Sequence, residues 1–229
     1  MFGKNIPISQ EIDPLGVLNV VSIFYTIQGE GPYSGMPAVF LRLAGCNLRC
    51  TWCDTDFETG AHKMLASEVY NDVLKKSKGL AQVCVITGGE PMLQNIVPVI
   101  KLLNHYMLKV QIETAGTVWI PGLEKCDYTI VCSPKTPKLN PAIIDNCQHF
   151  KYVVGVGDKI VHGRIVTATQ PGAKPAALAY PEKSKSIWIQ PRDDQDAEKN
   201  AANLIFARDL CLEYGYRMSV QLHKIINVE

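Results

Sequence analysis

The chain has 229 residues, of which 47% are hydrophobic and 20% are charged, so it can bury the core of one globular domain without disulfide bonds. Its 23 basic and 22 acidic side chains leave a formal charge of +1, which argues against nucleic acid or an anionic membrane as a partner. The sequence has neither the apolar core of a secretory signal nor an apolar run approaching the ~20 residues of a membrane span. We expect a cytoplasmic protein with a single domain over residues 1–229.

Short apolar runs rich in Val and Ile alternate along the chain with longer segments of helical spacing. The predicted strands are, in chain order, 38–43, 83–87, 109–113, 128–132, 150–154, 186–190 and 218–222. The predicted helices, with apolar residues every three or four positions, are 66–77, 92–106 and 195–214. This alternation predicts an α/β fold in which a parallel sheet, with strands buried on both faces, has helices on its outside. Residues 155–186 contain three prolines and no helical period, so we expect an irregular excursion there.

Polar or glycine-bearing segments follow four of the predicted strands. They are Thr-Gly-Gly-Glu at 87–90, Glu-Thr-Ala-Gly at 113–116, Ser-Pro-Lys at 133–135 and Gln-Pro at 190–191. Because parallel α/β proteins bind ligands at the carboxyl ends of their strands, these segments are expected to border one site.

Three of the eight cysteines, Cys46, Cys50 and Cys53, lie within eight positions of one another, directly after the first predicted strand. Thiolates are the ligands that iron–sulfur clusters select. Three of them would leave one iron of a [4Fe-4S] cluster without a protein ligand, and an open position marks a reactive metal site. A structural zinc site completed by a distant side chain, or unliganded core thiols, are the alternative interpretations.

The Cys-x-x-x-Cys-x-x-Cys spacing, together with Gly88-Gly89-Glu90-Pro91 after the second predicted strand, resembles the signature of the radical S-adenosylmethionine (SAM) enzymes. The resemblance implies a partial (β/α) barrel. It also implies that the open iron binds the methionine end of SAM and that one-electron cleavage yields a 5′-deoxyadenosyl radical. No catalytic side chain is assigned beyond the cluster and the radical.

Motifs in order along nearly the whole chain are similar to those of the 7-carboxy-7-deazaguanine synthase family. They are Tyr-Thr-Ile-Gln-Gly-Glu-Gly at 25–31, Gly-x-Pro-Ala-x-Phe-x-Arg-Leu-x-Gly-Cys at 35–46, Cys-Asp-Thr at 53–55, Glu-Thr-Ala-Gly-Thr at 113–117 and Gln-x-His-Lys at 221–224. The resemblance excludes about the first 18 residues and residues 155–186. It implies conversion of 6-carboxy-5,6,7,8-tetrahydropterin to 7-carboxy-7-deazaguanine with loss of ammonia, a step toward queuosine, assisted by magnesium.

The resemblance also implies roles for individual residues. The cluster ligands are Cys46, Cys50 and Cys53, and Thr55 contacts Mg²⁺, which prefers a few oxygen ligands. SAM is expected to contact Gly88, Gly89, Glu90, Ser133, Lys135 and Gln190. The substrate is expected to contact Ile27, Gln28, Gly29, Glu30, Arg42, Thr87 and His223. Apart from the resemblance, we expect the α-carboxylate of the terminal Glu229 to reach the substrate as well, because it follows His223 by only six residues. Taken singly, these residues have ordinary structural alternatives, such as a turn at 28–31, a helix cap at Thr55 or a core histidine at His223.

Two other functions remain open at this point. Enzymes that install a glycyl radical on a protein partner use the same cysteine spacing, and their sequence between the first two cysteines is often similar to Cys46-Asn47-Leu48-Arg49-Cys50. A non-catalytic zinc or redox-sensing module belongs to a different class. As partners we expect a pterin, an electron donor such as flavodoxin or ferredoxin, and a second copy of the chain in a homodimer, since a partial barrel exposes sheet edges.

Overall fold

The computed structural model describes residues 5–181 and 185–228. A nine-stranded sheet forms its centre, in the order β12-β11-β7-β6-β5-β4-β2-β1-β3. All neighbours from β2 to β12 run parallel, whereas β1 pairs antiparallel with both β2 and β3. A mostly parallel, open sheet with helices packed on it confirms the predicted α/β fold of partial-barrel type.

Six of the predicted strands are present with bounds shifted by a residue or two. They are β2 (Pro37–Leu43), β4 (Val83–Gly88), β5 (Lys109–Thr114), β6 (Thr129–Cys132), β7 (His149–Val154) and β11 (Ser186–Pro191). Two further strands, β1 (Leu18–Ile27) and β3 (His62–Met64), lie outside the predicted set. The β-branched and aromatic sequence of β1 carried the strand signal, and β1 forms a hairpin with β2 through the short 3₁₀ helix η1 (Gly31–Tyr33).

The strand predicted at 218–222 is wrong beyond its first residue. β12 covers only Arg217–Met218, and α5 (Leu222–Ile225) follows it. The backbone N–H of Leu222 donates to Gly29 O at 3.2 Å, and the Ser219 hydroxyl accepts from Gly31 N at 3.3 Å. The C-terminal segment therefore turns away from the sheet to pack on the turn that follows β1.

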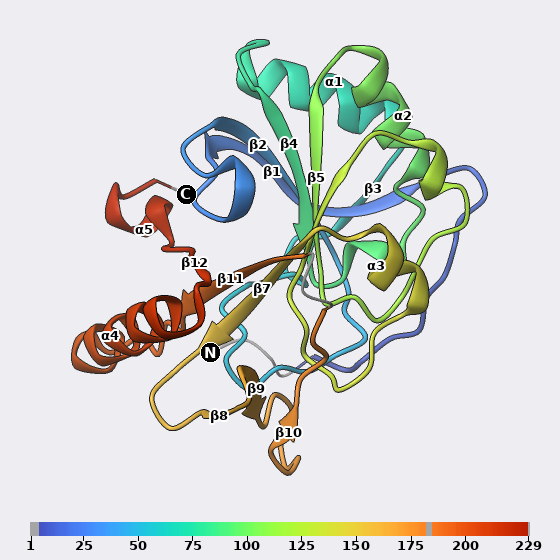
Figure 1. Ribbon diagram of the computed structural model, residues 1–229. Coiled ribbons are helices and arrows are strands. Elements are labelled where there is room, and N and C mark those ends of the chain that lie inside the picture. Colours follow the sequence, from blue (N-terminus) through green and yellow to red (C-terminus); the bar gives the residue numbers. More distant parts are fainter. Residues whose placement is uncertain (1–4, 182–184, 229) are drawn as a thin grey trace.

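The helices that precede β12 flank the sheet on its outer side (Figure 1). The predicted bounds of α1 (Ala66–Ser77) are confirmed, and Glu68 caps it by accepting from Leu65 N at 2.7 Å. Asp196 caps α4 (Ala197–Tyr214), which packs against β11. The helix predicted at 92–106 is wrong over its first part, because η2 (Pro91–Leu93) is followed by extended backbone, and α2 (Val97–His105) starts again with Pro98 in its first turn.

Two segments between parallel strands contain elements that the sequence did not predict. α3 (Pro141–Asn146) begins at the Asn140 cap, whose side chain accepts from Ala142 N at 3.0 Å. The segment expected to be irregular contains a separate antiparallel sheet of β8 (Lys159–Val161), β9 (Arg164–Thr167) and β10 (Ala176–Ala177). Its strands have two to four residues, too short for periodicity to reveal them.

The two faces of the parallel sheet differ in chemistry. Residues such as Leu41, Ile86, Ile112 and Tyr152 point into the large apolar core shared with the helices. The alternate residues form a small apolar cluster around Val85 at one end and become polar toward the carboxyl ends. Burial of the strands on both faces is confirmed, but the inner face is not apolar throughout. Within the described residues, no helix is long and apolar enough to cross a membrane.

Candidate active site

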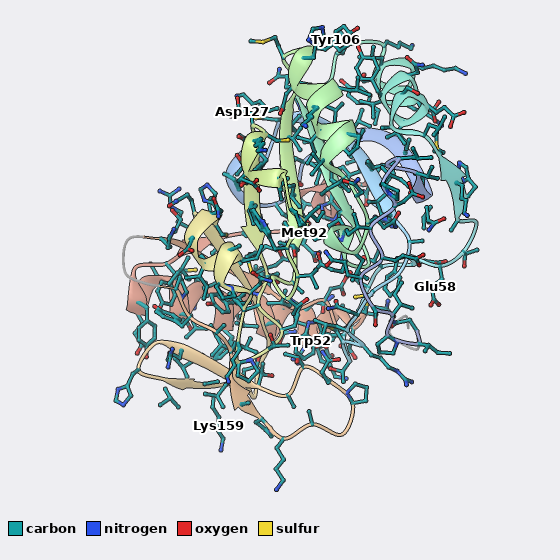
Figure 2. All side chains as sticks on the ribbon, turned by 90° about the vertical axis from the view of Figure 1, so that its right-hand side faces the viewer. Trp52, Glu58, Met92, Tyr106, Asp127 and Lys159 are labelled. Atoms are coloured by element: carbon teal, nitrogen blue, oxygen red, sulfur yellow. The ribbon has the colours of Figure 1, made fainter. Side chains whose placement is uncertain are left out.

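A cavity of about 530 Å³ lies at the carboxyl ends of the parallel strands. It is bordered by the inner-face side chains of β2, β4, β5, β7 and β11, by the loop that follows β2, and by the C-terminal segment. In Figure 2, Trp52 marks the loop after β2, whereas Tyr106 and Asp127, which precede β5 and β6, lie at the opposite end of the molecule. The site is therefore at the edge of the sheet that the sequence predicts.

Strand alternation places charged side chains on the inner face. Arg42 of β2 is paired in register with Thr87 of β4, and both border the cavity. Glu113 of β5 and Lys151 of β7 point the same way, because their neighbours Ile112 and Tyr152 belong to the outer core. Because alternate residues of a strand point to opposite faces, each of these strands has polar side chains toward the cavity and apolar side chains toward the core.

A buried network of charges and amides forms this wall. The Lys151 ammonium pairs with the Glu30 carboxylate and lies 3.9 Å from an oxygen of Glu113. Gln221 Nε2 donates to Glu30 Oε1 at 3.1 Å, and Gln28 Nε2 donates to Glu113 Oε1 at 3.1 Å. We call Gln28, Glu30, Glu113, Lys151 and Gln221 the polar wall.

Pairing decides the charge states in the polar wall. Burial alone would raise the pKa of Glu30, but the attraction of Lys151 and its hydrogen bond outweigh burial, so the pKa lies below its ordinary value. Burial alone would lower the pKa of Lys151, but Glu30 and Glu113 raise it above its ordinary value. Both groups are therefore ionised at neutral pH, and each carries the partner that a buried charge requires.

The three thiols predicted as ligands border the same cavity, on the loop between β2 and β3. Burial raises the pKa of Cys46 to about 12 and also raises that of Cys53. Cys46 and Cys53 are therefore protonated until a metal supplies positive charge, as expected for ligands that lose their protons on metal binding. Among the described residues, no three His, Cys, Asp or Glu side chains are grouped around a position for a single metal ion.

The glycine pair after β4 allows the chain to touch the start of this loop. A Cβ at Gly88 would lie 2.1 Å from Leu43 O, and one at Gly89 would lie 2.1 Å from Gly45 O. Glu90 N donates to Gly45 O at 2.9 Å across the same contact. The absence of side chains here is required by backbone packing, and it leaves both glycines on the wall of the cavity.

Glu90 lies behind the cavity wall and is fully buried. Its carboxylate accepts from Met92 N at 3.1 Å, from the Thr114 hydroxyl at 2.8 Å and from Ala115 N at 2.8 Å. Burial raises the pKa of Glu90, and these three hydrogen bonds oppose the increase. The side chain therefore holds the end of β5 against the end of β4.

Ser133 and Lys135, which follow β6, and Gln190 of β11 were predicted to contact SAM, and all three border the cavity on strands that lie away from β1 in the sheet order. Lys135 Nζ donates to the Ser133 hydroxyl at 2.5 Å, and burial lowers the pKa of Lys135. The Oε1 of Gln190 is buried and has no hydrogen-bond partner in the described part of the chain.

Other unpaired polar atoms border the cavity. Among residues 5–181 and 185–228, the buried donors without a partner include Arg42 Nε and Trp52 Nε1, and the buried acceptors include Asn5 Oδ1 and Gln190 Oε1. Buried polar groups are normally paired, so these atoms indicate that ligands complete the site. A cavity with three thiols and unpaired donors and acceptors fits both an iron–sulfur cluster and a polar cofactor.

A chain of ion pairs connects the mouth of the cavity to the C-terminal segment. Lys224 Nζ lies 2.5 Å from Asp193 Oδ2 and 3.6 Å from Asp54 Oδ2. The Thr55 hydroxyl donates to Asp54 Oδ1 at 3.1 Å. His223 borders the cavity, and burial lowers its pKa although Glu30 opposes the decrease.

The structure brings most of the predicted site residues together. Those that border the cavity are Gln28, Glu30, Arg42, Cys46, Cys50, Cys53, Thr55, Thr87, Gly88, Gly89, Ser133, Lys135, Gln190 and His223. Ile27 pairs with Pro37 in the hairpin, Gly29 contacts the C-terminal segment, and Glu90 lies behind the wall, so these three are not among the residues that border the cavity. Glu229 lies outside the described residues.

The sequence analysis missed several residues of the site. Lys151 and Gln221 belong to the polar wall, and Asn5 reaches the cavity from the N-terminal segment. A lysine within the apolar run 150–154 was an available signal, because a charge in a buried strand requires a partner. No local pattern indicated Asn5, because its place depends on a contact between distant segments.

Comparisons with known proteins agree with this site. Residues 41–137 match the model of the Radical SAM superfamily, which includes the cysteine loop, the glycine pair and Lys135. A 7-carboxy-7-deazaguanine synthase from Rhodospirillum rubrum is 38% identical over 239 residues, covering 100% of both chains. Another from Rickettsia prowazekii is 36% identical, covering 93% of this chain and 89% of its own. The crystal structure of QueE from Escherichia coli superimposes with a TM-score of 0.67 and 22% identity, over 90% of this chain and 94% of that one, which supports the fold.

Proposed function

The chain belongs to the 7-carboxy-7-deazaguanine synthase family of radical SAM enzymes, and on this basis we propose that it converts 6-carboxy-5,6,7,8-tetrahydropterin to 7-carboxy-7-deazaguanine with loss of ammonia. The relative from Rhodospirillum rubrum matches over its whole length and the one from Rickettsia prowazekii over 89% of its length, which supports this reaction above a glycyl-radical activating enzyme or a zinc module. A radical SAM enzyme carries a [4Fe-4S] cluster and SAM, which together supply the radical chemistry.

One observation carries the proposal. The thiols of Cys46, Cys50 and Cys53 and the polar wall border the same cavity. The thiols would hold the cluster, and Gly88, Gly89, Ser133, Lys135 and Gln190 would surround SAM. The substrate would then lie between the polar wall and the cluster, close to the radical that is formed from SAM and that abstracts hydrogen from the substrate.

The polar wall suits the edge of a pterin, which offers several donors and acceptors side by side. Glu30 and Glu113 supply carboxylate acceptors, and Gln28 supplies an amide that already bridges the two segments. Because Lys151 and Gln221 hold Glu30 in place, its carboxylate is oriented before the substrate enters. Ile27, Gly29 and Glu90 would act through the backbone or through their neighbours.

The substrate carboxylate needs a cation or a set of donors. Arg42 has an unpaired, buried Nε on the wall of the cavity, and its guanidinium lies 5.5 Å from the centre of the Phe24 ring. A fixed guanidinium binds a carboxylate through two hydrogen bonds. The Thr55 hydroxyl, with Asp54 beside it, offers oxygen atoms suited to Mg²⁺ near the cysteine loop. His223 and the terminal Glu229 would complete the substrate side.

The proposal extends to location and partners. We expect a cytoplasmic enzyme that takes its electron from a flavodoxin or ferredoxin. A homodimer is supported by exposed apolar side chains on α4, where Leu204, Ile205 and Leu212 are all more than 40% exposed. Light scattering of the purified protein tests the oligomeric state.

Anaerobic turnover tests the reaction. The reconstituted protein is supplied with SAM, Mg²⁺, a reductant and 6-carboxytetrahydropterin, and products are identified by mass spectrometry. We expect 7-carboxy-7-deazaguanine and ammonia with little net consumption of SAM. Cleavage of SAM without that product would refute the proposed substrate and leave the radical chemistry intact.

A further inference from the structure

The cysteine loop has no regular secondary structure between β2 and β3. Its shape therefore depends on contacts from other segments. On one side the N-terminal segment contributes a hydrogen bond from Ile8 N to Cys46 O at 3.0 Å, and the Asn5 amide donates to Leu48 O at 3.0 Å. These contacts support the first half of the loop.

The second half of the loop is supported by the segment that follows β9. Arg49 N donates to Gln170 Oε1 at 2.8 Å, and Thr51 N donates to Thr169 O at 3.0 Å. The two residues that flank Cys50 are thus both fixed by neighbouring residues of one distant segment. In addition, Gln170 Nε2 donates to Cys50 Sγ at 3.6 Å.

Gln170 is itself held in place. The Thr169 hydroxyl donates to Lys135 O at 2.5 Å, which ties the segment to the loop after β6. The Gln170 carbonyl accepts from Ala173 N at 3.1 Å in a turn, and β9 and β10 pair on either side of that turn. The amide of Gln170 is therefore presented by the small antiparallel sheet and does not depend on the cysteine loop alone.

We propose that Gln170 is a positioning residue for the cluster: its Oε1 fixes the backbone beside Cys50, and its Nε2 donates a hydrogen bond to the sulfur of Cys50 that raises the reduction potential of the cluster. This inference rests on the cluster site of the proposed function. When the cluster accepts an electron, its sulfurs become more negative, so a donor to one sulfur stabilises the reduced form more than the oxidised form. The small sheet then has a function in a segment where the sequence resembles no family motif.

Two substitutions separate the contacts that the Gln170 side chain makes with the cysteine loop. Gln170→Glu keeps an oxygen that accepts from Arg49 N but replaces the donor to Cys50 Sγ by a negatively charged oxygen. Gln170→Leu removes both contacts without adding a charge, and both variants lose the contact of Nε2 with the Thr169 hydroxyl at 3.4 Å. Gln82→Leu is the matched control, because Gln82 is exposed at the start of β4, at the opposite ends of the strands. The reconstituted holoenzymes are titrated with reductant and the reduced cluster is followed by electron paramagnetic resonance.

We expect a more negative midpoint potential in both Gln170 variants, and an unchanged potential in Gln82→Leu. Hydrogen exchange of the Arg49 amide should be faster in Gln170→Leu and unchanged in Gln170→Glu, which reports the loop without reference to activity. A wild-type potential in Gln170→Glu would overturn the role of the hydrogen bond, even if Gln170→Leu failed to retain its cluster. Iron and sulfide analysis of the wild type separates the two proposals, since a wild type without cluster would refute the cluster site itself.

Discussion

The polar wall and the cysteine loop border the same cavity but are built in different ways. Two members of the wall, Glu113 and Lys151, lie on strands whose alternate residues form the core, so their positions follow from the sheet itself, and Lys151 in turn holds Glu30. The loop has no such frame and is fixed by hydrogen bonds from residues 5–8 and 169–170. Substitutions in the wall should therefore affect the stability of the fold, whereas substitutions in the loop should affect the cluster and leave the fold intact.

The largest effect is expected from Cys50→Ala. Removal of one of three protein ligands should abolish the [4Fe-4S] cluster and all SAM cleavage, because the remaining two thiols cannot hold it. The fold should remain, since Cys50 is outside the apolar core. Iron and sulfide content, circular dichroism and SAM cleavage are the measurements. Cys211→Ala, on α4, serves as the control that keeps its cluster. Turnover by the Cys50 variant would contradict the assignment of the ligands.

Lys151→Met tests the wall through stability. Without the ammonium, the buried Glu30 and the partly buried Glu113 lose the cation that they share, which should cost about 3–5 kcal/mol and lower the melting temperature by roughly 6–20 °C. The double variant Glu30→Gln/Lys151→Met should recover most of this loss, because no unpaired charge remains at Glu30. Lys63→Met, at an exposed position on β3, should change stability by less than about 0.5 kcal/mol. A single variant as stable as the wild type would show that the pair does not organise the wall.

A smaller and more selective effect is expected from Thr55→Ala. Loss of one oxygen ligand should raise the Mg²⁺ concentration needed for half-activation about tenfold, since a hydrogen bond or ligand contact to a charged group contributes about 1.5 kcal/mol. The visible absorbance of the cluster should not change. Thr51→Ala, in the same loop with an exposed side chain, should keep the wild-type response. Loss of cluster absorbance in Thr55→Ala would show that Thr55 supports the loop instead of the metal ion.

The smallest effect concerns pH at the mouth of the cavity. The hydrogen bond from Lys224 lowers the pKa of Asp193 from 3.8 to about 2, although partial burial opposes the decrease. A carboxyl with a lowered pKa in the folded state stabilises the fold above its ordinary pKa and loses that contribution as pH falls from about 4 toward 2. The contribution is at most about 1 kcal/mol because the pair is partly open to solvent.

Comparison of the wild type with Lys224→Met tests this expectation. The difference in melting temperature between the two proteins should be constant from pH 8 to pH 5 and should narrow only below about pH 4. A difference that already varied between pH 8 and pH 5 would assign the effect to another group, such as His223. Lys63→Met again provides the control, because the exposed Lys63 lies on β3, away from this cluster of ion pairs.

The accuracy of the sequence predictions follows the same division between strands and loops. Buried parallel strands such as β4 and β7 were predictable because their residues must be apolar on the outer face whatever surrounds them. The helix at 92–106 was predicted too long. Glu90 N donates to Gly45 O and the Glu90 carboxylate accepts from Met92 N, and these two hydrogen bonds hold residues 89–94 in a tight turn. The spacing of apolar residues carries no information on such contacts. The strand predicted at 218–222 failed because Ser219 and Leu222 bond to the turn after β1, almost two hundred residues away in the chain.

By itself the sequence indicated the α/β class, the family and fourteen of the residues that border the cavity, because strand composition, cysteine spacing and short motifs are local properties of the chain. The tertiary structure decided which of these residues border the cavity. Glu90, which the sequence placed in contact with SAM, is instead fully buried behind the residues that border it. The tertiary structure also added Asn5, Gln170 and Gln221, whose positions are set by contacts between segments far apart in sequence, and it paired Lys151 of β7 with Glu30. Such contacts depend on how the sheet folds and where the loops dock, and no local pattern of residues encodes them.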